Sequence, residues 1–220
     1  MLHKNKSKNK NTGFDHFTAR FYPLKKSKNN INFRLKLNLA TMKIVKYLVI
    51  AAMAIIALVL ITALFTKRDY AVEREITINK PKQEVFNYIK LLKNQSNYSK
   101  WVMMDPNAKM EYKGTDGTVG FVSSWDSKNK HVGKGEQEIT KIVDGERIEL
   151  GLHFIKPFES RANAYMITGA VSDNQTKVKW GFYGTMKYPM NIMLIIMNMD
   201  KEIGDDLQTG LNNLKGVLEK

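Results

Sequence analysis

The segment RIELGLHFI, residues 147–155, decides the fold class because its side chains alternate between apolar and polar. Ile148, Leu150, Leu152 and Phe154 fall on one face of an extended chain. The segment KVKWGFYGTM, residues 177–186, repeats the pattern with apolar side chains at Val178, Trp180, Phe182 and Met186. Strands with one apolar face pack it on a core and leave the other face in water, which is typical of an antiparallel sheet.

Further strand-like segments lie before and between these two. Between residues 109 and 186 about six such runs are separated by turn residues, including Asp144-Gly145 and Ser172-Asp173-Asn174. Because the links are short, neighbouring strands are expected to pair as antiparallel hairpins. One more strand is predicted at 70–78, ahead of a short helix that starts near Pro81. The sequence therefore predicts a seven-stranded antiparallel sheet.

The last part of the chain changes to a helical period. Apolar side chains recur at steps of seven, four, four, three and four residues, at Ile196, Ile203, Leu207, Leu211, Leu214 and Leu218. This stripe predicts a long C-terminal helix that covers the apolar face of the sheet. Residues 70–220 are therefore expected to form one α+β domain.

The run from Tyr188 to Met197 is also apolar, but it is too short to span a bilayer. In one interpretation its side chains form the buried first turns of the terminal helix. In the other, the run forms a pliable cover at the mouth of a cavity and touches the membrane. The sequence leaves both interpretations open.

Residues 47–65 read YLVIAAMAIIALVLITALF and contain no charged side chain. At roughly 1.5 Å per residue such a helix reaches close to the thickness of a bilayer core. We predict a transmembrane helix at 44–66. A cleaved signal peptide is the alternative, but its apolar core is usually shorter and ends in a small-x-small site, which 62–66 lacks. A buried core helix is disfavoured because a segment apolar on every face has no partner ahead of the domain.

The formal net charge of +14 is concentrated before this helix. Residues 1–41 hold ten Lys or Arg and one acidic residue, whereas residues 67–220 hold 23 basic and 20 acidic residues. We expect 1–41 to be a disordered basic leader; alternatively, translation starts at Met42, whose neighbours resemble the start of an export signal. The nearly balanced domain gives no indication of a nucleic-acid partner.

The charges that flank the apolar segment predict its orientation. Lys43 and Lys46 precede it together with the basic leader, and Lys67 and Arg68 follow it. The positive-inside rule therefore favours a cytoplasmic N-terminus and a domain outside the cytoplasm.

Several reaction classes are excluded or disfavoured. The chain has no cysteine, which excludes disulfides, thiolate nucleophiles and cysteine-ligated metals. His131 is expected in a polar turn and His153 on the wet face of its strand. Glu136 and Glu138 share one strand face, which is expected to be solvated. We therefore predict no catalytic residue, no metal site and no cofactor.

Taken together, these segments resemble the SRPBCC superfamily, whose members are also described as START-like or polyketide cyclase/dehydrase-like. The resemblance rests on VEREITINKPKQEVFNYI at 72–89, YSKWVMMDP at 98–106, the strand from Gly117 to Trp125, VGKGEQEIT at 132–140 and GLNNLKGVLEK at 210–220. It implies a helix-grip fold, in which a curved seven-stranded sheet surrounds a long C-terminal helix. The preceding apolar helix is similar to that of membrane-anchored bacterial members.

The resemblance also implies an apolar cavity between the sheet and the terminal helix, which relatives use for lipids, sterols, polyketides or other hydrophobic small molecules. The inward positions expected to line it are Trp101, Phe121, Trp125, Leu152, Phe154, Met166, Trp180, Phe182, Met186, Met193 and Met197.

The superfamily contains both binders and enzymes. Our first hypothesis is a membrane-tethered domain that binds a lipid or another hydrophobic small molecule. The alternatives are an enzyme of the polyketide-cyclase or hydrolase type and a chaperone-cofactor-like interaction surface. Few polar residues fall on inward positions, Ser123 and Thr168 being the best, and this favours binding.

Overall fold

The computed structural model describes residues 28–220. Within them the chain forms, in order, the elements α1 (Lys28–Phe65), β1 (Asp69–Ile78), α2 (Lys82–Ile89), η1 (Leu92–Asn97), α3 (Lys100–Met103), β2 (Lys109–Lys113), β3 (Val122–Asp126), β4 (Lys134–Val143), β5 (Arg147–Lys156), β6 (Ser160–Ser172), β7 (Gln175–Thr185), η2 (Met190–Ile192), α4 (Met193–Ile196) and α5 (Met199–Leu218), where η marks a 3-10 helix.

Helix α1 contains the apolar segment. Its part Thr41–Phe65 is long and apolar enough to cross a membrane, with a mean hydropathy of 3.0. The helix begins at Lys28 rather than at the predicted residue 44, so it extends into the segment that we expected to be disordered. Extension of a formed helix gains one hydrogen bond per residue, which lets polar residues continue it. The remainder of the predicted leader, 1–27, lies outside the described residues.

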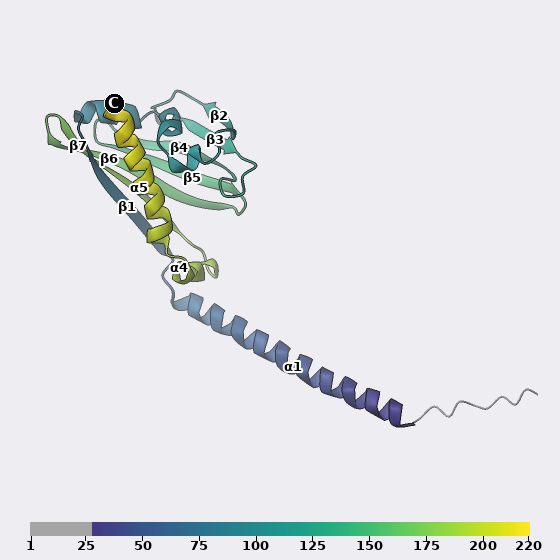
Figure 1. The fold of residues 1–220 in the computed structure, drawn as a ribbon. Helices are drawn as coiled ribbons and strands as arrows, with labels where there is room; N and C mark the ends of the chain where they lie inside the picture. Colours follow the sequence, from purple (N-terminus) through teal and green to yellow (C-terminus); the bar gives the residue numbers. More distant parts are fainter. Residues whose placement is uncertain (1–27) are drawn as a thin grey trace, which may run out of the picture. The chain divides into compact units, whose positions relative to one another are not determined.

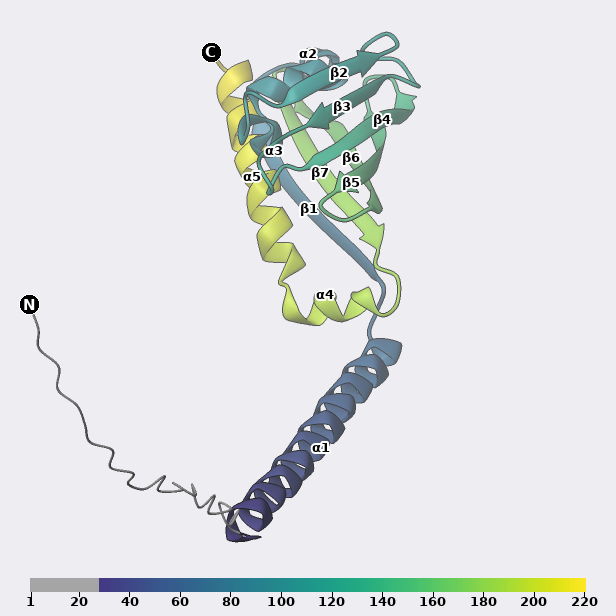
Figure 2. The same ribbon diagram turned by 90° about the vertical axis from the view of Figure 1, so that its right-hand side faces the viewer.

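The domain is a helix-grip fold, as predicted. Its seven described strands form one antiparallel sheet in the order β1-β7-β6-β5-β4-β3-β2. The sheet curves, and α5 lies across its concave face, next to β1 and β7 (Figures 1 and 2). The short segments η1 and α3, between β1 and β2, lie next to α5 (Figure 2).

The strand register shows which strand ends lie together at one end of the sheet. Asp69 at the start of β1 pairs with Thr185 at the end of β7. Phe154 at the end of β5 pairs with Ser160 at the start of β6 and with Gly135 near the start of β4. Since Gly135 also pairs with Trp125 near the end of β3, these positions share one end of the sheet. This is the end from which the chain leads back to α1.

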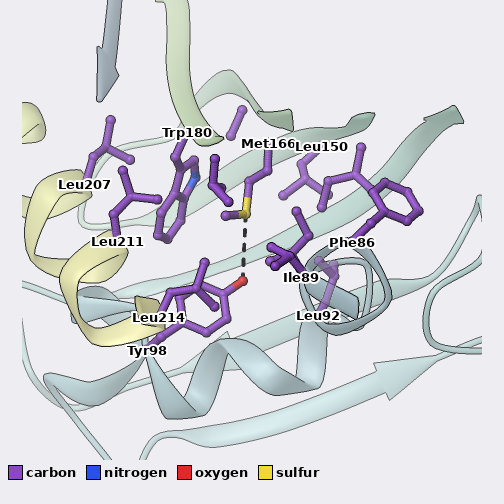
Figure 3. Packing of buried hydrophobic residues seen from close by; sticks show 14 of the residues in the cluster. Phe86, Ile89, Leu92, Tyr98, Leu150, Met166, Trp180, Leu207, Leu211 and Leu214 are labelled. Carbon is purple, nitrogen blue, oxygen red and sulfur yellow. Dashed lines mark hydrogen bonds between the residues drawn. The ribbon is translucent and has the colours of Figure 1, made fainter. Parts of the chain in front are cut away.

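The core lies between α5, α2 and the apolar face of the sheet. Leu207, Leu211 and Leu214 of α5 are fully buried, which confirms the centre of the predicted stripe (Figure 3). Ile203 and Leu218 are partly buried and pack against the same core. Ile196 is an exception because α5 begins only at Met199, where Asn198 caps the helix by accepting a hydrogen bond from the Lys201 backbone N–H at 3.0 Å. The prediction that Ile196 belongs to the buried stripe is therefore wrong, and its side chain is 72% exposed.

Tyr98 is the largest fully buried side chain in the described residues. Its hydroxyl donates a hydrogen bond to the Met166 sulfur at 3.8 Å (Figure 3). Burial raises the pKa of Tyr98 well above its usual value, so the phenol stays neutral and acts as a packing group.

Two glycines of α5 provide a matched test of how closely the helix approaches the sheet. A Cβ atom on Gly210 would lie 2.7 Å from the Trp180 ring, whereas one on Gly216 would meet nothing within 4 Å. We expect Gly216→Ala to raise the free energy of unfolding by about 1 kcal/mol through helix propensity. Gly210→Ala should lower it by about 1–3 kcal/mol because the ring must move. Urea titrations followed by circular dichroism would measure both, and equal shifts of the same sign would contradict the close contact.

Candidate binding cavity

A cavity of about 410 Å³ lies between the concave face of the sheet, α3 and the start of α5. This volume falls within the range of roughly 300–1,000 Å³ that is usual for small-molecule sites. Its walls are mostly apolar and aromatic. The lining residues are Gln95, Ser99, Trp101, Val102, Ala108, Met110, Trp125, His131, Val132, Gln137, Leu150, Leu152, Phe154, Lys156, Pro157, Phe158, Ser160, Ala164, Trp180, Phe182 and Ile203.

Aromatic rings support the wall of this cavity. The Trp180 ring makes edge-to-face contacts with Tyr98 and Trp101, at centroid distances of 5.7 and 5.9 Å. The Trp125 ring makes a similar contact with Phe154 at 6.1 Å. Edge-to-face pairs of this kind fix ring orientation in addition to burying apolar area. The aromatic rings of the cavity wall are therefore held in fixed orientations and form an apolar surface.

Three buried polar side chains lie among these apolar walls. Gln137 donates a side-chain hydrogen bond to the Gln95 carbonyl oxygen at 2.8 Å, and the two side chains are 8% and 4% exposed. Ser99 beside them is 2% exposed. Among the described residues, no other side-chain hydrogen bond uses the Gln95 amide hydrogens or the Gln137 carbonyl oxygen. The pair therefore offers both donors and an acceptor to the cavity.

The glutamine pair should show strong energetic coupling. Gln137→Leu leaves the buried Gln95 amide without its partner, so we expect a loss of about 1–3 kcal/mol in the free energy of unfolding. Replacing both glutamines with leucine removes the unpaired group and should recover most of that loss. A double-mutant cycle by urea denaturation measures the coupling. Additive effects of the two substitutions would show that the hydrogen bond contributes nothing.

The cavity reaches the surface at the turn between β5 and β6. Phe158 in this turn lines the cavity and is 81% exposed. His131 and Lys156 are also exposed lining residues at this rim. In the described part of the chain, these two are the titratable groups of the lining. The rim lies at the end of the sheet from which the chain leads back to α1.

The structure brings together six of the eleven predicted cavity residues. These six are Trp101, Trp125, Leu152, Phe154, Trp180 and Phe182. Their contact with a ligand remains a prediction.

The other five predicted residues lie elsewhere. Phe121 and Met166 are fully buried in the hydrophobic core, because the Tyr112 ring stacks on Phe121 and Tyr98 covers the Met166 sulfur. Met186, Met193 and Met197 are outside the lining because the chain leaves the sheet after Thr185 and α5 starts only at Met199.

Ser123 and Thr168, the polar residues expected at inward positions, are both buried, but neither lines the cavity of about 410 Å³. Thr168 uses its hydroxyl to donate a hydrogen bond to the Gly145 carbonyl at 2.9 Å, away from the cavity. Ser123 is buried and lines a neighbouring cavity of about 320 Å³, which also contacts Gln95 and Gln137. Gln137 could have been found from the sequence, since it lies two residues before the inward-facing Ile139 on one strand.

The opposite face of the sheet carries a separate hollow of about 930 Å³ with charged walls. One of its carboxylates is held in an ion pair with a lysine. Glu73 contacts Lys179 at 2.8 Å and accepts a hydrogen bond from the Tyr165 hydroxyl at 2.6 Å. The hydrogen bond from Lys179 lowers the pKa of Glu73 below its usual value. This face is a solvated ion-pair surface, and His153 lies on it, as predicted.

Among the described residues, no group of three or more His, Asp or Glu side chains is arranged to hold a metal ion.

Comparison with known proteins supports the fold. No protein-family profile and no curated protein sequence matches this chain. Solved structures do match. A protein of Nitrosospira multiformis is 15% identical over 68% of this chain and 96% of that chain, with a TM-score of 0.50. A protein of Chromobacterium violaceum is 12% identical over 68% of this chain and 97% of that chain, also with a TM-score of 0.50. Truncated norcoclaurine synthase of Thalictrum flavum matches at 9% identity over 69% of this chain and 94% of that chain, with a TM-score of 0.50.

These structural neighbours are SRPBCC or Bet v 1-like proteins, so the resemblance seen in the sequence is confirmed at the level of fold.

Proposed function

We propose that this chain is a membrane-tethered binding domain that takes up a lipid or another hydrophobic small molecule in the cavity beside α5. The observation that carries the proposal is the cavity of about 410 Å³ with aromatic walls and a buried glutamine pair. Burial of an apolar ligand against such walls provides affinity. The amide pair adds a site for one neutral polar group, because it offers donors and an acceptor without a formal charge.

The membrane tether is the second part of the proposal. It is supported by Thr41–Phe65, whose hydropathy and length suit a span. The charge distribution supports a cytoplasmic N-terminus, with the domain on the other side of the membrane. A cleaved signal peptide is the competing possibility, and the intact mass of the protein isolated from membranes distinguishes the two.

The alternative of a polyketide-cyclase-like or hydrolase-like enzyme uses the same cavity. A structure of norcoclaurine synthase with dopamine and hydroxybenzaldehyde, 9% identical and with a TM-score of 0.50, has this fold. Such chemistry requires a positioned acid or base near the substrate. The titratable lining groups among the described residues, His131 and Lys156, are exposed at the rim. This arrangement supports binding over catalysis.

Native mass spectrometry of the full chain in lipid nanodiscs, after exposure to a total lipid extract, tests the proposal. We expect one class of bound molecule to remain on the chain after release from the nanodisc. Lipids that surround α1 should dissociate equally from the parent and from a variant with a filled cavity. Retention that does not depend on the cavity would reject the binding function.

A further inference from the structure

The segment between β7 and α5 leaves large apolar side chains in solvent. Met190, Ile195 and Ile196 are 60%, 61% and 72% exposed, and Met197 is partly exposed beside them. The interpretation of this run as buried first turns of the terminal helix is therefore wrong for these residues. Soluble surfaces rarely carry so many neighbouring large apolar side chains without a partner.

Asn191 joins this segment to the end of α1. Its side chain is fully buried, and its amide donates hydrogen bonds to the backbone carbonyls of Ala63 at 2.7 Å and Thr66 at 3.0 Å. The last carbonyls of a helix have no partner within the helix, so Asn191 satisfies acceptors that would otherwise need water. The end of α1 from Ala54 onward belongs to the same compact unit as the domain, and this contact lies within that unit.

The same end of the sheet carries further groups suited to a membrane surface. Phe158 projects from the β5–β6 turn at the cavity rim with 81% exposure. Lys67, Arg68 and Lys187 are exposed near the junction of α1 and β1, where the Met186 backbone N–H donates to the Arg68 carbonyl at 2.8 Å. Basic side chains beside apolar ones are typical of segments that lie in the interface of a phospholipid bilayer.

We infer that Met190, Ile195, Ile196, Met197 and Phe158 form a docking face that inserts into the surface of the bilayer anchored by α1. We identify the bilayer as the partner of this face because Asn191, within the exposed apolar segment, is hydrogen-bonded to the end of the apolar helix α1. Leu64 and Phe65 at that end are likewise exposed, which continues the apolar surface. The inference rests on the proposed tether and adds that the cavity mouth at Phe158 opens toward lipid.

The chain has no cysteine, so single-cysteine labelling has no background. We would label Ile196→Cys and Phe158→Cys with an environment-sensitive fluorophore in the full chain, reconstituted into vesicles of phosphatidylcholine and phosphatidylglycerol. A nitroxide on an early acyl carbon of a fraction of the lipid serves as quencher. Leu58→Cys in the apolar helix reports insertion. Val171→Cys is the matched control, because Val171 is exposed at the β6–β7 hairpin, at the opposite end of the sheet.

We expect the labels at Ile196 and Phe158 to be quenched several-fold more strongly than the label at Val171. Quenching at Leu58 but not at Ile196 or Phe158 would overturn the docking face and leave the tether intact. Quenching at Ile196 without quenching at Leu58 would reject the tether and, with it, a docking face on the bilayer that α1 crosses. If no position is quenched, both the docking face and the membrane tether are rejected. Circular dichroism verifies folding, and Met190→Cys gives a second position on the segment if one variant misfolds.

Discussion

Replacing Ala164 with phenylalanine should lower ligand retention at least about tenfold, which corresponds to roughly 1.4 kcal/mol of binding free energy. Ala164 lies on β6, is 5% exposed and lines the cavity between its register partners Leu150 and Phe182. An aromatic ring at this position extends into open volume and occupies space that a ligand needs. Because the space is empty of protein atoms, the free energy of unfolding should change by less than about 1.5 kcal/mol.

The matched control is Ala170→Phe on the same strand. Ala170 is exposed and does not line the cavity, so retention should equal that of the parent. Both variants would be compared by native mass spectrometry after exposure to the same lipid extract. Unchanged retention in a folded Ala164→Phe variant would place the ligand elsewhere and reject this cavity as the binding site.

The sheet and its terminal helix were predictable because each rests on a strong local pattern. The alternation around Trp180 and the stripe through Leu207 and Leu211 reflect burial against one surface, and burial imposes the period. The same logic predicted that His153 faces solvent. For side chains in a regular strand or helix with one buried face, the sequence alone was sufficient to predict which of them face the core and which face solvent.

The cavity lining was only partly predictable. The sequence pattern shows which face of a strand a side chain lies on, but not whether other side chains or an open cavity lie in front of it. Met166 and Leu152 both face inward, yet Tyr98 covers Met166 while Leu152 borders the cavity. Gln95 lies in a 3-10 helix whose orientation depends on tertiary packing, so no sequence period indicates it. The break before Met199 depends on the Asn198 cap, which follows the apolar run directly and carries no separate sequence signal.

Replacing Trp180 with alanine should reduce the free energy of unfolding by about 3–5 kcal/mol, the largest effect expected of a single substitution in this domain. The indole is 4% exposed, meets the rings of Tyr98 and Trp101 edge to face and packs against Gly210 of α5. Its removal therefore disturbs the sheet, the helix and the short helical segments together. Urea titration of the full chain in detergent, followed by circular dichroism, measures the change.

Tyr183→Ala is the matched control because Tyr183 lies on the same strand, faces the solvent side and is 36% exposed. Its loss should cost less than about 1 kcal/mol, since little apolar area is removed from the core. Trp180 also lines the cavity, so its loss should weaken binding, and a ligand that binds only the folded state should stabilise the Trp180→Ala variant less than the parent. If the difference in the free energy of unfolding between parent and variant is the same with and without ligand, Trp180 contributes to packing alone. If Trp180→Ala lowers the free energy of unfolding no more than Tyr183→Ala does, the contact between α5 and the sheet is contradicted.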